Sequence, residues 1–217
     1  MRSLLHIADA LLRGGHVAHR AALLIILVGA PLYGAAAGTF AFERPERALQ
    51  VLYSAIKLPI LLLLTTALCL PVLFVVATVA GRREAFALII RAILAGQAAM
   101  SISLASLAPF VVFCYVSAIT YNTAKFINGV LFAVATIVAH IVLRRQTREL
   151  RARDPGVGVL LVAWGLLYVF VGIQLAWTIR PFIGQPGAAT TFFRSEPFTN
   201  AYVELGRVLG GLARARR

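Results

Sequence analysis

PILLLLTTALCLPVLFVVATVA, from Pro59 to Ala80, is the stretch of sequence that decides the fold. It contains no charged side chain. A helix needs about 20 consecutive apolar residues to cross the hydrocarbon core of a bilayer. Lipid offers no hydrogen bonds to the backbone, so a segment that crosses it has to pair its own N–H and C=O groups, as a helix does. We therefore predict a transmembrane helix over residues 59–80.

The rest of the chain repeats this pattern. Of its 217 residues, 60% are hydrophobic and 13% are charged, whereas soluble domains have roughly 45–50% apolar and 25% charged residues. We predict an all-α, polytopic transmembrane helix bundle with five spans and amphipathic interfacial helices at both ends. The transmembrane domain covers residues 21–180, and its other predicted spans are residues 21–40, 98–120, 126–143 and 158–179.

The third span has two possible boundaries. Apolar residues continue from 85 to 120, which is too long for one upright span and too short for two with a loop. We place a break at Gly96-Gln97, so that EAFALIIRAILAG becomes a half-inserted helix. The alternative is a tight hairpin at Ser106 to Pro109, which would give six spans.

Three segments outside the predicted spans are expected to form helices that lie on the membrane surface. The first lies within the N-terminal amphipathic segment, residues 1–20, and the second covers residues 43–58. The third is a helix over residues 198–212 in the extramembrane tail, 181–217, and has one apolar stripe at helical spacing. The residues of this stripe are Phe198, Tyr202, Leu205, Leu209 and Leu212.

The basic residues predict the orientation of the chain. The formal net charge is +13, but the arginines fall between apolar runs, where they meet anionic headgroups, so nucleic acid is not an expected partner. Because cytoplasmic loops are enriched in Lys and Arg, we expect the N-terminus and the cluster from Arg144 to Asp154 to be cytoplasmic. Lysine occurs only at Lys57 and Lys125, a bias typical of a GC-rich bacterial genome, so we expect a bacterial inner membrane.

The sequence lacks the residues that common membrane chemistry needs. No Asp or Glu lies in a predicted span, whereas coupled transporters use such carboxylates, and no hydrolase or phosphate-binding motif occurs. We therefore expect no catalytic residue, no metal site and no cofactor, and the protein is predicted not to be an enzyme. His140 alone lies in a span, so a bis-His haem would need a second chain; a hydrogen-bonded ring near the interface is the simpler interpretation.

Small and polar residues inside the apolar runs are candidates for helix packing or for contacts with a partner. Gly34 and Gly38 form a GxxxG unit, which lets two helix backbones approach closely. Trp164, Trp177 and Arg180 are spaced as interfacial anchors. Polar side chains in lipid usually hydrogen-bond across helix interfaces, and the candidates of this kind are Gln97, Ser101, Ser103, Ser106, Asn128 and Gln174.

The middle of the chain resembles the Yip1-type family of five-span membrane proteins. YSAIKLPILLLL, from Tyr53 to Leu64, has a lysine-proline entry to a span, and FALIIRAILAGQAAMSISLASLAP, from Phe86 to Pro109, joins an amphipathic helix to a span interrupted by Ser and Pro. The resemblance implies a membrane-organising or trafficking role without a catalytic residue set. The chain departs from this family after its last span, where the tail adds a further amphipathic helix.

These observations leave three hypotheses for function. The first, which we favour, is a non-catalytic integral membrane scaffold or accessory subunit that organises or stabilises a larger membrane assembly, with lipids and other membrane subunits or its own copies as partners. The second is a channel or facilitator for a small molecule or lipid, lined by the serines with Gln97 and Asn128. The third is a cofactor-holding subunit that uses His140.

Overall fold

The computed structural model describes residues 18–42 and 45–193. Most of the predicted N-terminal amphipathic segment and the predicted tail helix over residues 198–212 lie outside the described residues. Within them, five helices are long and apolar enough to cross a membrane, and no strand occurs. The predicted all-α, five-span bundle is confirmed, and the protein is an integral membrane protein. The five spans are α2 (His19–Gly38), α3 (Ala48–Val79), α4 (Phe86–Val116), α5 (Tyr121–Gln146) and α7 (Pro155–Thr178).

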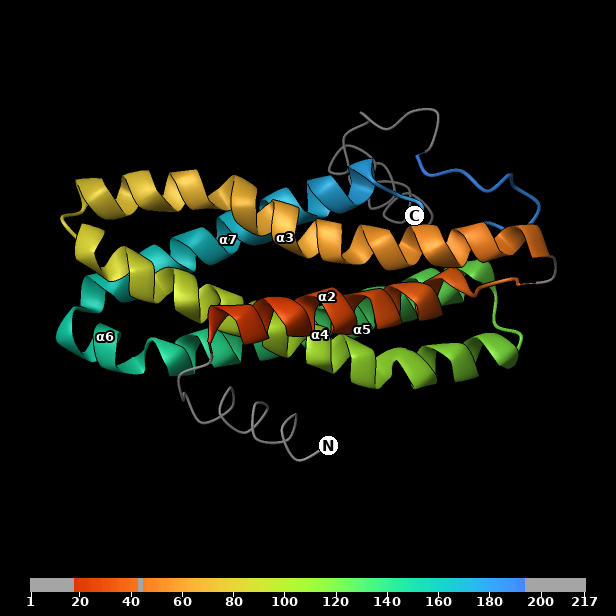
Figure 1. The fold of residues 1–217 in the computed structure, drawn as a ribbon, viewed down its shortest axis with the longest axis horizontal. Helices are drawn as coiled ribbons and strands as arrows, with labels where there is room; N and C mark the ends of the chain where they lie inside the picture. The colour runs from red at the N-terminus through yellow and green to blue at the C-terminus, as the bar shows by residue number, and fades with distance from the viewer. Residues whose placement is uncertain (1–17, 43–44, 194–217) are drawn as a thin grey trace, which may run out of the picture.

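The spans run alternately in opposite directions and give the molecule two distinct ends (Figure 1). The basic side, on the left in Figure 1, holds the turn with η2 (Arg83–Ala85) and the turn with α6 (Arg148–Arg153). The cap side, on the right, holds η1 (Pro45–Arg47), the turn between α4 and α5, and the segment 179–193 that follows α7. We use these two names below.

The predicted division of the third apolar region is wrong. Residues 86–116 form one continuous helix, α4, which contains both Gly96 and Pro109. Gly96 does not break the helix but lets α5 approach, since a Cβ there would lie 3.1 Å from the Ala139 carbonyl oxygen. The Ser106 hydroxyl donates to the Ile102 carbonyl one turn back at 2.9 Å, so there is no hairpin either. At 1.5 Å per residue, the 31 residues of α4 span about 46 Å, well beyond a core of about 30 Å.

The second span also begins earlier than predicted. Residues 48–58 are the first three turns of α3, so the surface helix expected over residues 43–58 is wrong for this part. These turns pack against α2 because Gly34 and Gly38 leave room for them. A Cβ on Gly38 would lie 2.7 Å from the Cα of Val51, and one on Gly34 would overlap the Ser54 carbonyl oxygen. The GxxxG unit therefore serves a contact within this chain.

The hydrophobic core has two parts that lie at different depths. One joins α2, α3, α4 and α5 around Ile26, Leu62 and Met100. The other lies toward the basic side, where Leu73 and Trp164 bring α7 against α3 and α4. All the buried residues of α7 fall between Val157 and Tyr168, so the second half of this helix, residues 169–178, has none. The second half of α7 is therefore only partly covered by the rest of the bundle.

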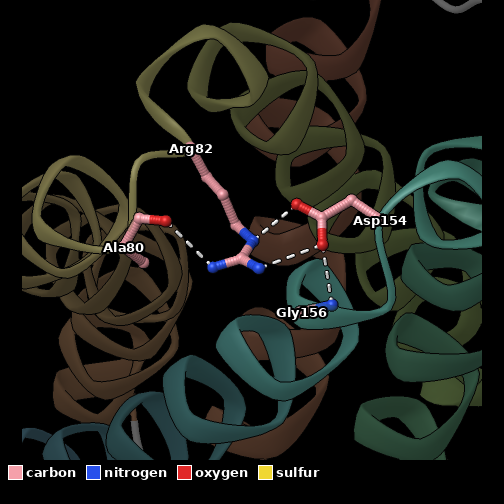
Figure 2. Close-up of polar contacts among 4 residues, drawn as sticks. All are labelled: Ala80, Arg82, Asp154 and Gly156. Atoms are coloured by element: carbon pink, nitrogen blue, oxygen red, sulfur yellow. Dashed lines mark hydrogen bonds and ion pairs between the residues drawn. The ribbon is translucent and has the colours of Figure 1, made fainter.

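An ion pair joins two turns on the basic side, as Figure 2 shows. Arg82, in the turn after α3, donates through Nε to Asp154 Oδ2 and through Nη2 to Oδ1 at 3.0 Å. Asp154 also caps α7, because its Oδ1 accepts from the Gly156 backbone N–H at 2.9 Å. The hydrogen bond and the charge of Arg82 hold the pKa of the Asp154 carboxyl below its ordinary value. One carboxylate thus starts α7 and fixes it to the end of α3.

Substitution of Gly34 tests the contact between α2 and α3. We expect Gly34→Ala to lower the free energy of unfolding by about 1–3 kcal/mol, because the added methyl overlaps backbone atoms that cannot move away alone. The matched control is Gly129→Ala in α5, where the new Cβ meets nothing within 4 Å. Thermal unfolding in one detergent compares the two, and a Gly34→Ala variant as stable as Gly129→Ala would contradict the predicted contact.

The ion pair predicts a stability that depends on pH. Since the pKa of Asp154 is lowered in the folded protein, its contribution is present at neutral pH and is lost as the pH falls below about 4. Asp154→Asn keeps a capping side chain but removes the charge. We expect its unfolding temperature to be below that of the wild type at pH 7 and to converge with it at acidic pH. An equal difference at both pH values would show that the charge is not what matters.

Candidate functional site

Three polar side chains on one face of α3 are buried near the cap side. Gln50, Ser54 and Lys57 follow one another at helical spacing, and none is more than 2% exposed. A buried ammonium group loses its hydration, which costs several kcal/mol unless other groups replace the water. These side chains therefore need partners close to the end of the bundle.

The segment after α7 supplies the partners (Figure 1). It folds back over the first turns of α3, and Lys57 Nζ donates to the Pro181 carbonyl oxygen at 2.9 Å. Ser54 Oγ donates to the Phe182 carbonyl oxygen at 2.6 Å. The Lys57 ammonium also lies 4.7 Å from the centre of the Phe192 ring, which offers it a cation–π contact. We call Gln50, Ser54, Lys57 and residues 181–192 the α3 cap.

The α3 cap has two further hydrogen bonds, one from the residue before α3 and one between two of its buried side chains. Arg47, just before α3, donates to the Gln185 carbonyl oxygen at 2.9 Å. Gln50 donates to Ser54 Oγ at 3.0 Å, which connects the buried side chains to each other. In the sequence, Lys57 was distinguished only as one of two lysines and as part of the lysine-proline entry to the second span. The polar spacing of residues 50, 54 and 57 at the head of an apolar run was the signal that could have identified this cluster.

A cavity of about 330 Å³ opens beside the α3 cap, between α5 and the end of α7. Its floor is formed by α2 and α3, and Phe182 of the α3 cap closes one end of it. The lining is almost wholly apolar, but Lys125 and Asn128 border it on the α5 side. We call it the lateral cavity. It lies on the flank where α7 has no buried residue.

Asn128 holds the α5 wall of the lateral cavity in place. Its Oδ1 accepts from the Tyr33 hydroxyl of α2 at 2.9 Å. Its Nδ2 donates to the Tyr115 hydroxyl of α4 at 2.7 Å and to the Ala124 carbonyl oxygen at 2.8 Å. One amide thus connects three spans, which is the kind of contact that polar residues make inside a membrane protein.

A second polar cluster lies deeper, where α4, α5 and α7 meet. His140 Nδ1 lies 2.9 Å from the Thr136 carbonyl oxygen and therefore carries the proton. Its Nε2 then faces α7, where a Cβ on Gly165 would lie 3.1 Å away. The adjoining cavity measures about 20 Å³, and Gln97 and Trp164 also line it. That volume suits one water molecule and is far too small for a haem or a pigment.

The other predicted polar residues do not come together. Ser103 and Ser106 each donate to the carbonyl oxygen one turn back in α4, at 2.9 Å. Ser101 is fully buried against α2 and lies beside Gly29. Gln174 lies on the second half of α7, where its carbonyl oxygen accepts from the Thr178 hydroxyl at 2.9 Å. Within the described residues, the serines and amides belong to separate contacts and form no common path across the bundle.

The predicted anchors occupy two different environments. Trp177 lies at the end of α7, and the Arg180 guanidinium stacks 3.5 Å from the centre of its ring. Trp164 does not face the interface, because its side chain is only 5% exposed and packs against Tyr168 inside the bundle. The spacing between Trp164 and Trp177 does not show toward which side of the helix each ring points.

The part of the chain that the structure describes has neither a metal site nor an acidic side chain in a spanning helix. No group of three or more His, Cys, Asp or Glu side chains is placed to hold a metal ion, and none of the five spanning helices contains Asp or Glu.

In comparisons with known proteins, no family model, no curated protein and no solved structure matches this chain.

Proposed function

We propose that this protein is a non-catalytic scaffold or accessory subunit of a larger membrane assembly. The observation that carries the proposal is the outer face of α7. Val159, Val162, Leu166, Phe170 and Ile173 are between 46% and 73% exposed and follow one another at spacings of three or four residues. They form a straight apolar ridge along the whole helix.

This ridge suits a second transmembrane helix as well as it suits lipid chains. Ala163 lies beside the ridge and is also exposed, and a small residue there lets a neighbouring backbone come close. Several polar groups of the spans are used in contacts within the chain, as the Asn128 and Ser103 bonds illustrate. These features support a packing role, and the resemblance to Yip1-type proteins points in the same direction.

The two alternative functions have less support. A channel needs a shared polar path, whereas the predicted lining residues make separate contacts. A cofactor bound to His140 needs space beside Nε2. Gly165 of α7 lies next to this atom, because even a Cβ on Gly165 would be 3.1 Å from it. A membrane-organising subunit without a catalytic centre requires neither feature.

We test the partner surface with a photoreactive amino acid introduced at Leu166 or Phe170. In native membranes, each position is expected to give one discrete protein adduct, either with another subunit or with a second copy of this chain. Positions Leu24 and Val28 on α2 have comparable exposure, 63% and 61%, and show whether a protein adduct is specific to α7. The absence of a protein adduct at both α7 positions would contradict the proposal.

We further propose that the basic side faces the cytoplasm of a bacterial cell, with the protein in the inner membrane. The support is the arginine cluster in and around α6, because cytoplasmic loops are rich in Lys and Arg. Cysteines at the exposed positions Asn122 and Glu149 report the orientation. An impermeant thiol reagent that enters only the periplasm should label Asn122→Cys and spare Glu149→Cys. The reverse pattern would overturn the orientation.

A further inference from the structure

The lateral cavity has a shape that restricts what can occupy it. Gly129 of α5 lies at its edge with no atom within 4 Å of the place where a Cβ would be. On the opposite side of the lateral cavity, α7 contributes Ala176 to the lining. The lateral cavity is bordered by α2, α3, α5 and the end of α7 and measures about 330 Å³. This space is enough for a segment of an extended hydrocarbon chain.

The lining and the depth of the lateral cavity point to a hydrocarbon chain. Leu58 and Leu61 of α3, Phe132 of α5 and Ile183 of the α3 cap contribute apolar surface. Because the five spans lie in a bilayer, the molecules that reach an apolar cavity between them from the side are lipids. Phe182 and Ile183 of the α3 cap complete the lining on the side of α3.

The cationic side chain of Lys125 borders the lateral cavity and selects the charge of the headgroup. Lys125 is exposed one turn after the start of α5, and its Nζ lies 4.8 Å from the centre of the Tyr121 ring, so the side chain extends toward the interface. A cation at the border of an apolar cavity complements the anionic headgroup of a lipid whose acyl chain lies in that cavity.

We propose that the lateral cavity binds one anionic phospholipid, with an acyl chain against Gly129 and Phe132 and the phosphate beside Lys125. Asn128 keeps the α5 wall at its distance from α2 and α4, so the site is formed before the lipid enters. This binding requires no protein partner and is independent of the proposed scaffold role.

The test uses the full chain in phosphatidylcholine nanodiscs that contain a small fraction of phosphatidylglycerol with a photoreactive acyl chain. After illumination, peptide mass spectrometry locates the adducts. We expect adducts in residues 125–132 and 176–183, at least about fivefold above those from the matched photoreactive phosphatidylcholine. Equal labelling of these residues by the two lipids would overturn the proposal.

Four variants separate the lateral cavity from general attraction to basic residues. Gly129→Leu should fill the cavity and abolish these adducts, while Gly129→Ala should retain them. Lys125→Gln should remove the fivefold preference for phosphatidylglycerol, whereas Arg91→Gln, which removes an exposed charge of α4 toward the basic side, should not. Unfolding temperatures in lipid-free detergent verify that each variant is folded. Unchanged adducts in folded Gly129→Leu, or an unchanged preference in Lys125→Gln, would contradict the inference.

Discussion

The buried ammonium group of Lys57 is the constraint on which the cap side of this protein depends. The side chain is 1% exposed, in a helix whose other residues are mostly apolar. Such a charge is tolerated only when hydrogen bonds replace its hydration. The Pro181 carbonyl oxygen provides one, and the Phe192 ring covers the ammonium group. The course of the chain after its last span follows from this requirement, because no other described segment brings a carbonyl oxygen to Lys57.

The first turns of α3 do more than lengthen the helix, because they carry the buried side chain of Lys57. They extend α3 past the hydrocarbon core, pack on the glycines of α2 on one side, and carry the polar face that the α3 cap covers on the other. At the basic side, Asp154 performs the corresponding task by fixing the start of α7 to the turn after α3. Between these two attachments, the buried residues of α7 end at Tyr168. The lateral cavity lies beside the half of the helix that follows.

The sequence predicts the number and positions of the spans well, because each crossing needs its own apolar run and lipid penalises any exception. It predicts less well where a helix begins or continues. Gly96 was interpreted as a break, although it provides the space for α5, and residues 48–58 were interpreted as a surface helix, although they are the first turns of α3 and pack one face against α2. In each case the helix boundary depends on contacts with atoms of a segment that is distant in the sequence. Periodicity identifies a polar or small residue on a face, but not the neighbour that meets it.

The same limit applies to the predicted site residues: the sequence identifies them but not the groups they contact. Gly34, Gly38 and Asn128 were identified as packing candidates, and the structure places all three between spans of this chain. The α3 cap was missed because its acceptors are backbone carbonyl groups, which leave no mark in the sequence. Trp164 was predicted as an interfacial anchor but is buried inside the bundle.

The most direct test of the account is a distance between the start of α3 and the segment that covers it. Spin labels at Leu49 and Gln185, both exposed, can be measured by pulsed electron paramagnetic resonance in lipid nanodiscs. The account predicts one narrow distance distribution for the otherwise wild-type chain and a broad one when Lys57→Met is added. A broad distribution with Lys57 present, or an equally narrow one in Lys57→Met, would contradict the central role of the buried ammonium group.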